Sequence, residues 1–245
     1  MIDELVNKVV WITGAGRGIG AATAKKFIDR GSIVVASSTR EFNDYVDLGF
    51  YPDEFKQIDN FLYLKCDIRN QIDINSIYAQ IIARFGTLDI LINNAGIGVF
   101  KPFTETSIEE FDDLMSINVR GAFLCIKSVL ENMLNNQSGT IVNISSVAVV
   151  ENFANCSIYN ASKSALLAMS RSLRNEVRQH GIKLLDFIPG ATYTDIWDEK
   201  SKLNFKANMI SPDDLANVIL WNVAASIKGN LMVEEIIIRP QNGNL

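Results

Sequence analysis

The sequence predicts an α/β fold with a doubly wound, mostly parallel sheet of about seven strands and helices on both faces, of the Rossmann type. Three observations support this prediction. Short β-branched runs alternate with longer segments of helical periodicity, which is the order of βαβ units with right-handed crossovers. The runs are continuously apolar, as in strands buried on both faces. A cluster of glycines also follows the first run and opens the first helical segment.

The elements follow one another in a regular order. Strands are predicted at 9–12, 33–36, 61–64, 88–92, 140–144, 183–188 and 235–238. Helices are predicted at 18–30, 73–85, about 107–134, about 157–180 and about 212–225. Ser107 with Glu110 has the spacing of a capping box, and Pro212 suits a first helical turn.

Two segments lack this regularity. Residues 40–58 are rich in aromatics and acids and are expected to be irregular. Residues 191–211 are polar and follow a strand end, so we expect a substrate lid there. Within that segment, Trp197 and Phe205 either line a substrate pocket or pack inside the lid. Because the chain shows neither a repeat nor a Pro/Gly-rich linker, we expect one domain over residues 1–245.

The composition excludes several classes of protein. Of the 245 residues, 48% are hydrophobic and 21% charged, which argues against a disordered chain. The net charge is −5, so neither nucleic acid nor an anionic membrane is an expected partner. The three cysteines are far apart, and the single histidine, His180, is expected to end a helix, so we expect no metal site. Without a signal-peptide pattern or a membrane-spanning apolar stretch, the expected location is cytoplasmic.

The first motif with a chemical meaning is Thr13-Gly14-Ala15-Gly16-Arg17-Gly18-Ile19-Gly20. Glycines let the backbone turn tightly and approach a pyrophosphate, and the N-terminus of the following helix offers free N–H groups to phosphates. The spacing is G-x-x-x-G-x-G rather than G-x-G-x-x-G, and a turn without a ligand is the plain alternative. The position of the motif between the first strand and the first helix favours a dinucleotide site.

The end of the second predicted strand indicates which dinucleotide is bound. An acid at this point of a Rossmann-type site accepts from the ribose 2′-hydroxyl of NAD(H). This chain has Ser37-Ser38-Thr39-Arg40 there. Ser38, Arg40 and Arg17 can each donate to a 2′-phosphate, although Arg40 as an ordinary solvated charge is the alternative. The sequence therefore favours NADP(H) over NAD(H).

Two further motifs follow later strands. Asn93-Asn94-Ala95-Gly96 ends the fourth, where amides and small residues can line a cofactor or tie strands together. Tyr159 and Lys163 are four residues apart, so they share one face of the expected helix. A phenol has an ordinary pKa of about 10, and a nearby ammonium lowers that pKa towards the range useful for acid–base catalysis. A solvated pair is the alternative, but these two follow a strand ending Asn143-Ile144-Ser145-Ser146.

Together these motifs resemble the short-chain dehydrogenase/reductase family, in its compact single-domain branch. The matching positions follow the family's order along nearly the whole chain: Thr13-Gly14-x-x-x-Gly18-x-Gly20, Asn93-Asn94-Ala95-Gly96, Asn118, Ser146, Tyr159-x-x-x-Lys163 and Pro189-Gly190. The segment from Ile238 to Gly243 departs from the Val-Asp-Gly-Gly that many relatives carry after the last strand.

The resemblance implies a role for each matching residue. Tyr159 would be the general acid in reduction, and Lys163 would lower its pKa and hold the nicotinamide ribose. Ser146, thirteen residues before the tyrosine, would bind the substrate oxygen, and Asn118 would position a water in a proton relay through Lys163. The cofactor would also be held by Gly14, Arg17, Gly18, Ile19, Gly20, Ser38, Arg40, Asp67 near the adenine, Asn93, Ala95, Gly96, Pro189, Gly190, Thr192 and Thr194.

The expected function is hydride transfer between NADP(H) and a small-molecule carbonyl or secondary alcohol substrate. The alternative from another class is a non-catalytic NADP(H)-binding sensor or regulatory protein. A sensor has no use for the complete set of Ser146, Tyr159 and Lys163, so the enzyme is favoured. The resemblance further implies a homodimer or homotetramer formed through the helices at about 107–134 and 157–180.

Overall fold

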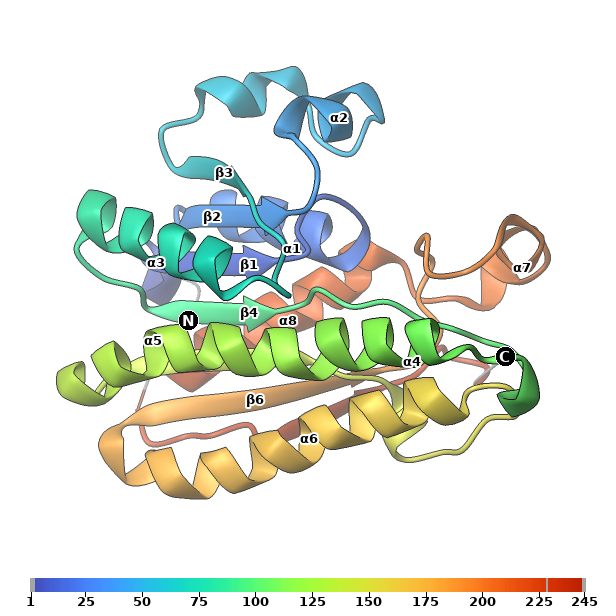
Figure 1. Cartoon of the computed structure of the whole chain (residues 1–245). Coiled ribbons are helices and arrows are strands. Elements are labelled where there is room, and N and C mark those ends of the chain that lie inside the picture. Colours follow the sequence, from blue (N-terminus) through green and yellow to red (C-terminus); the bar gives the residue numbers. More distant parts are fainter. Residues whose placement is uncertain (1–2, 228, 244–245) are drawn as a thin grey trace.

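The computed structural model describes residues 3–227 and 229–243, which form a seven-stranded parallel sheet between two layers of helices (Figure 1). The strand order is β3-β2-β1-β4-β5-β6-β7. The strands are β1 (Val9–Thr13), β2 (Ile33–Ser38), β3 (Phe61–Lys65), β4 (Ile90–Asn93), β5 (Gly139–Ile144), β6 (Ile182–Pro189) and β7 (Glu235–Ile238). The predicted fold class, a doubly wound sheet of the Rossmann type, is confirmed.

The helices divide between the two faces of the sheet. Their bounds are α1 (Gly18–Ile28), α2 (Phe42–Asp47), α3 (Gln71–Phe85), α4 (Ile108–Met115), α5 (Ala122–Asn136), α6 (Ser157–Val177), α7 (Glu199–Phe205) and α8 (Pro212–Ile227). Helices α1 and α8 pack together on one face, and α3, α5 and α6 cover the other (Figure 1). Successive side chains of β1 therefore enter different cores: Val10 and Ile12 lie with α1 and α8, Val9 and Trp11 with α3 and α5.

Four segments differ from the sequence prediction. The helix expected at about 107–134 is divided into α4 and α5 by a π-helical stretch, Ser116–Gly121. The fourth strand begins at Ile90 rather than at residue 88. Residues 40–58 contain α2 and a 3₁₀ turn, and residues 191–211 contain α7. Helices α2 and α7 have six and seven residues, which is too short for helical periodicity to be recognised in a window of about 11 residues.

The predicted helix ends are confirmed where local chemistry fixes them. Ser107 and Glu110 form the full capping box at the start of α4, with Glu110 N donating to Ser107 Oγ (3.2 Å) and Ser107 N donating to the Glu110 carboxylate (2.8 Å). Pro212 is the first residue of α8. His180 ends a 3₁₀ turn that follows α6, and Gly181 after it has φ +71°.

The strand order brings the predicted site residues to one edge of the sheet. The chain runs outward from β1 to β3 and then returns to place β4 on the other side of β1, which creates the switch point at which such sheets bind ligands. Gly14 follows β1, Asn93 ends β4, Ser146 lies just after β5 and Gly190 follows β6. Since parallel strands share an orientation, all four positions lie at the same edge.

A chain of buried polar side chains connects the middle of the sheet to α6. Asn93 Nδ2 donates to Asn143 Oδ1 (2.9 Å), and Asn143 Nδ2 donates to Asp186 Oδ1 (3.2 Å). The other carboxylate oxygen of Asp186 accepts from the Ser170 hydroxyl and the Arg174 guanidinium, both at 2.5 Å. Burial raises the pKa of Asp186 to about 6, and its hydrogen bonds and the charge of Arg174 oppose this rise.

This arrangement predicts a large cost for removing the buried arginine. Arg174→Met should lower the free energy of unfolding at pH 8 by about 3–5 kcal/mol, because it leaves a buried carboxylate without its cation. The folded-state pKa of Asp186 is about 6, above the ordinary value of 3.8. The carboxyl is therefore mostly protonated at pH 5, and the cost should be smaller there. Urea denaturation at both pH values measures the effect.

The matched control lies one helical turn away. Arg171 forms an ion pair with Glu235 (2.7 Å), but its side chain is 56% exposed, so Arg171→Met should cost about 0–1 kcal/mol. Equal costs for the two variants at pH 8 would contradict the importance that we give to the buried pair.

Candidate active site

The glycine-rich loop between β1 and α1 packs closely on the segment that follows β4. Gly14 has φ +63°, and a Cβ atom there would lie 2.6 Å from Ala95 Cα. A Cβ at Gly20 would lie 2.4 Å from Asn94 Nδ2, which donates to the carbonyls of Thr13 and Gly14 (3.0 Å each). Asn94 is thus a positioning residue that the sequence analysis did not select, because its amide acts on a loop eighty residues away.

A cluster of tyrosines supports the same loop from the other side. The Tyr51 hydroxyl donates to the carbonyl of Ala15 (2.6 Å). The Tyr45 ring fills the space beside Gly16, where a Cβ would lie 2.1 Å from a ring carbon, and its hydroxyl bonds to Ser38 Oγ (2.8 Å). The sequence analysis noted that residues 40–58 are rich in aromatics, but the spacing of these residues did not show that their rings lie against the glycine loop.

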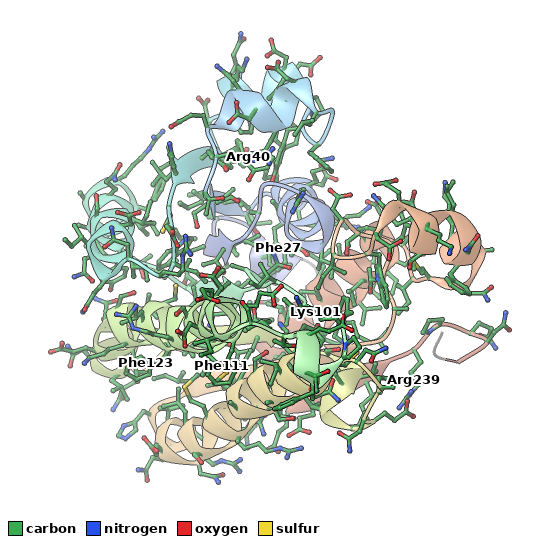
Figure 2. All side chains as sticks on the ribbon, turned by 45° about the vertical axis from the view of Figure 1, so that its right-hand side comes forward. Phe27, Arg40, Lys101, Phe111, Phe123 and Arg239 are labelled. Atoms are coloured by element: carbon green, nitrogen blue, oxygen red, sulfur yellow. The ribbon has the colours of Figure 1, made fainter. Side chains whose placement is uncertain are left out.

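The two arginines expected near the adenosine lie apart from each other. Arg17 Nη1 is 3.3 Å from Asp195 Oδ2, which connects the glycine loop to the segment after β6. Arg40 is exposed beneath the α2 segment (Figure 2), and its carbonyl accepts from the Tyr63 hydroxyl (3.1 Å). Both arginines are exposed to solvent, so neither guanidinium group is buried in the protein interior.

Asp67 lies just after β3, and its carboxylate is held by Arg69. Nε and Nη2 of Arg69 donate to Asp67 Oδ2 at 3.0 and 2.7 Å, and these bonds hold the pKa of the Asp67 carboxyl below its usual range. The side chain is one-third exposed. The carboxylate is therefore ionised at neutral pH, and Arg69 fixes its position.

Ser146, Tyr159 and Lys163 are brought together at the ends of β5 and α6. The Ser146 hydroxyl lies beside the Tyr159 phenol and lowers its pKa, whereas the Ser145 hydroxyl is buried without a partner among the described residues. Lys163 Nζ donates to the carbonyl of Ile144 (3.0 Å) and lies 6.0 Å from the centre of the Tyr159 ring. The serine expected from the thirteen-residue spacing is the one that faces the phenol.

Burial shifts the pKa values of both titrating groups toward their neutral forms. It raises the pKa of the Tyr159 phenol, and the hydrogen bond with Ser146 opposes the rise. It lowers the pKa of Lys163 to about 8. Lys163 Nζ lies 6.0 Å from the centre of the Tyr159 ring, and Lys163 is not among the causes of the pKa shift of Tyr159. The expectation that Lys163 lowers this pKa therefore stays a prediction.

Asn118 lies within the π-helical stretch and joins three segments. Its Oδ1 accepts from Ile97 N (2.9 Å), and its Nδ2 donates to Ile97 O (2.9 Å) and to Ser162 Oγ (3.0 Å). A Cβ at Gly96 would lie 3.2 Å from Asn118 Oδ1 and 3.3 Å from Lys163 Nζ. The absence of a side chain at Gly96 therefore leaves room directly beside the lysine, and π turns are common at such functional positions.

The segment after β6 reaches back to the glycine loop. Gly190 N donates to Ile238 O (2.7 Å) and continues the pairing of Pro189 with β7. Thr192 Oγ1 donates to Gly190 O (3.0 Å). Thr194 lies against the loop, because its methyl carbon would be 3.2 Å from a Cβ at Gly18, where φ is +55°.

These residues fit a dinucleotide. Helix α1 begins at Gly18 with no acidic residue in its first turn and no side-chain cap from Arg17, so its first N–H groups remain for a phosphate. Gly14 and Gly18 adopt positive φ at the loop, and Gly96 leaves space beside Lys163 at the other end. Within residues 3–227 and 229–243, no three His, Cys, Asp or Glu side chains gather as in a metal site. In the same residues, no helix is long and apolar enough to cross a membrane.

Comparison with known proteins gives a consistent result. The sequence profile described as short chain dehydrogenase matches residues 8–204. A sepiapterin reductase from Chlorobaculum tepidum is 30% identical over 252 residues, which cover 98% of this chain and 99% of the relative. An uncharacterized oxidoreductase from Staphylococcus haemolyticus is 29% identical over 239 residues, which cover 98% of this chain and all of the relative.

Two solved structures are similar over almost their whole length. A metagenomic short-chain oxidoreductase in complex with NADP is 27% identical, with a TM-score of 0.80 and coverage of 97% of this chain and 99% of that chain. The protein ElxO with NADP bound is 25% identical, with a TM-score of 0.84 and coverage of 95% and 97%.

Proposed function

The chain belongs to the short chain dehydrogenase family and is an oxidoreductase of it, and we propose that it interconverts a carbonyl compound and a secondary alcohol with NADP(H). The observation that carries this proposal is the meeting of Ser146, Tyr159 and Lys163 beside the open position at Gly96. A non-catalytic sensor would gain nothing from burying a phenol against a serine hydroxyl and a lysine.

In reduction, the bound NADPH supplies the hydride for the carbonyl carbon. Ser146 donates a hydrogen bond to the substrate oxygen, and Tyr159 transfers its phenolic proton to that oxygen as negative charge develops there. The products are the secondary alcohol and NADP⁺, and the phenolate must regain a proton. Because burial raises the pKa of the Tyr159 phenol, the group is protonated at neutral pH and ready to act as an acid.

Lys163 and Asn118 return the proton and place the nicotinamide ribose. The pKa of Lys163 is lowered to about 8, so its amine can give up and regain a proton near neutral pH, and a water held by Asn118 connects it to solvent. Asn118 is suited to this because its amide is fixed between Ile97 and Ser162. These two roles, like that of Ser146, are inferred from matching family positions.

The remaining predicted residues would hold NADP(H) along the sheet edge. The glycine loop (Gly14, Arg17, Gly18, Ile19, Gly20) would bind the pyrophosphate. Asp67 would meet the adenine and Asn93, Ala95 and Gly96 the adenosine ribose. Pro189, Gly190, Thr192 and Thr194 would meet the nicotinamide end. We also propose a cytoplasmic homodimer or homotetramer, which rests on the family resemblance alone.

The preference for NADP(H) is supported by a count of protons at the end of β2. The Ser38 and Tyr45 hydroxyls share one hydrogen bond of 2.8 Å and lie beside the Tyr63 hydroxyl, so the pair can turn one of its two protons toward a ligand oxygen. No carboxylate occupies position 38 to repel a 2′-phosphate. The two similar NADP-bound structures support the same cofactor class.

Tyr159→Phe should remove most turnover and leave cofactor binding nearly intact. General acid catalysis contributes about 10²–10⁴-fold, so kcat should fall by that factor, while the Kd for NADPH changes little. Tyr78→Phe, at a half-buried tyrosine on α3, is the matched control and should behave as the unmodified protein. An unchanged kcat in Tyr159→Phe, with chemistry rate-limiting, would refute the assignment.

The two adjacent serines provide a second prediction. Ser146→Ala should lower kcat/KM more than Ser145→Ala, because the Ser146 hydroxyl lies beside the Tyr159 phenol and lowers its pKa, whereas the Ser145 hydroxyl is buried without a partner among the described residues. Steady-state kinetics of both variants with the same substrate measures the ranking. The reverse order would show that the strand end presents the other serine to the substrate.

Cofactor selection is tested by equilibrium binding. The unmodified protein should bind NADPH about tenfold or more tightly than NADH, since one charge-assisted hydrogen bond contributes about 1.5–3 kcal/mol. Ser38→Asp should erase or invert this preference. Titrations that give equal Kd values for the unmodified protein, or tighter NADH, would reject the NADP(H) proposal.

The hydrogen bond between Ser38 and Tyr45 leads to a prediction for the two hydroxyls together. Ser38→Ala and Tyr45→Phe each leave one hydroxyl able to donate, so each alone should reduce the preference only slightly. The double variant leaves none and should lose about tenfold, a non-additive result. If the double variant lost no more than the worse single variant, the two hydroxyls would not substitute for one another.

A further inference from the structure

The Tyr159 phenol lies in apolar surroundings. Tyr159 is 8% exposed and forms a buried cluster with Leu114 and Ala148. Five partly buried side chains pack around this cluster: Ile97, Val99, Phe153, Ile158 and Ile196. They come from the segments after β4, after β5 and after β6, and from α6. A charged substituent carried into this cluster would lose its hydration without replacement, so the surroundings favour an uncharged substrate.

The ring of Phe100 covers the phenol. It meets the Tyr159 ring edge to face, with centroids 5.2 Å apart and planes at 74°. Gly98 makes this position available, because a Cβ there would lie 2.6 Å from Phe100 Cζ. Phe100 is nevertheless 37% exposed. It is therefore held by contacts with other side chains but also faces solvent, and it can leave without opening a fully buried core.

Trp197 forms the second wall. Its indole stacks on Phe100, with centroids 5.5 Å apart and planes at 21°, and its Nε1 donates to Thr192 O (3.1 Å). Of the two aromatic residues singled out in the 191–211 segment, Trp197 thus faces the phenol cluster, whereas Phe205 is 42% exposed. Edge-to-face and stacked contacts are the geometries that aromatic rings prefer, so the site already accommodates one flat ring.

Lys163 Nζ lies 6.0 Å from the centre of the Tyr159 ring and donates to the Ile144 carbonyl. Other charged side chains of the segments around the cluster are engaged in ion pairs. They are Lys101 with Glu110 (2.6 Å), Arg239 with Glu151 (3.0 Å) and Asp195 with Lys202 (3.0 Å). A carboxylate or phosphate on the substrate would have to compete with the carboxylates that hold Lys101, Arg239 and Lys202, and with the Ile144 carbonyl for Lys163. Electrostatics and apolar packing therefore favour the same class of substrate.

We propose that the substrate is an uncharged ketone, or the corresponding secondary alcohol, with an aromatic ring next to the reacting carbon. Its ring takes the place of Phe100 against Tyr159 and Trp197, which brings the carbonyl oxygen to the phenol. The inference rests on the oxidoreductase function proposed above and specifies its substrate. An aryl ketone, NADPH and one proton yield the aryl carbinol and NADP⁺.

Turnover of three ketones tests the class of substrate. Acetophenone carries the ring, 4-acetylbenzoate adds a carboxylate, and 2-butanone lacks a ring. With NADPH, kcat/KM for acetophenone should exceed that for each of the others by about tenfold. Trp197→Ala should lower kcat/KM for acetophenone more than for 2-butanone. Trp221→Ala, at a 54% exposed tryptophan on α8, is the matched control and should leave all three values unchanged. Equal or higher kcat/KM for 4-acetylbenzoate or 2-butanone would overturn the proposal.

A binding measurement separates failure of this inference from failure of the proposed function. Ligand-observed saturation-transfer NMR, with NADP⁺ present, should detect acetophenone bound to the unmodified protein and show a weaker signal with Trp197→Ala. An equal signal with the variant, an equal signal for 4-acetylbenzoate, or no acetophenone signal would overturn the assigned substrate class. If acetophenone binds as expected but no NADPH is oxidised, the result supports a binding site for an aromatic ring next to Trp197 and rejects the proposed oxidoreductase function.

Discussion

The placement of α6 against the sheet is the constraint on which the candidate site depends. Asp186 is fully buried and ties Ser170 and Arg174 of α6 to Asn143 of β5. A partly satisfied buried network costs more than an apolar core, so a shift of α6 along the sheet would leave the carboxylate unpaired. Because a helix is stiff, fixing its second half also fixes its first turns. Lys163 therefore reaches the Ile144 carbonyl, and Tyr159 meets Ser146.

The glycine loop is fixed in a similar way, through its carbonyl groups. Asn94 donates to the carbonyls of Thr13 and Gly14, and Tyr51 donates to that of Ala15. The acceptors of the loop are thus used inside the protein. Helix α4, by contrast with α1, satisfies its first N–H groups with a full capping box. Of these two helices, α1 is the one expected to bind phosphate, and its lack of a side-chain cap leaves its first N–H groups available to an anion.

The sequence predicted what depends on local pattern. The seven strands and helices α1, α3, α6 and α8 carry apolar spacing that is sufficient to recognise them. The π-helical stretch around Asn118 was missed because one wider turn hardly disturbs helical spacing. Helices α2 and α7 were too short to recognise. Asn94, Tyr45 and the Phe100–Trp197 stack act across long separations in the sequence, and no periodicity reports such contacts.

The segment after β6 joins the two ends of the candidate site. Thr194 packs on Gly18, Asp195 pairs with Arg17, and Trp197 stacks on Phe100. Three residues within a stretch of four thus contact the loop expected to hold the cofactor or the Phe100 ring beside Tyr159. Trp197 is also anchored to Thr192 by its indole N–H, so a hydrogen bond as well as the contact with Phe100 holds the indole in place. The segment after β6 therefore connects the glycine loop with the aromatic side chains around the phenol through direct contacts.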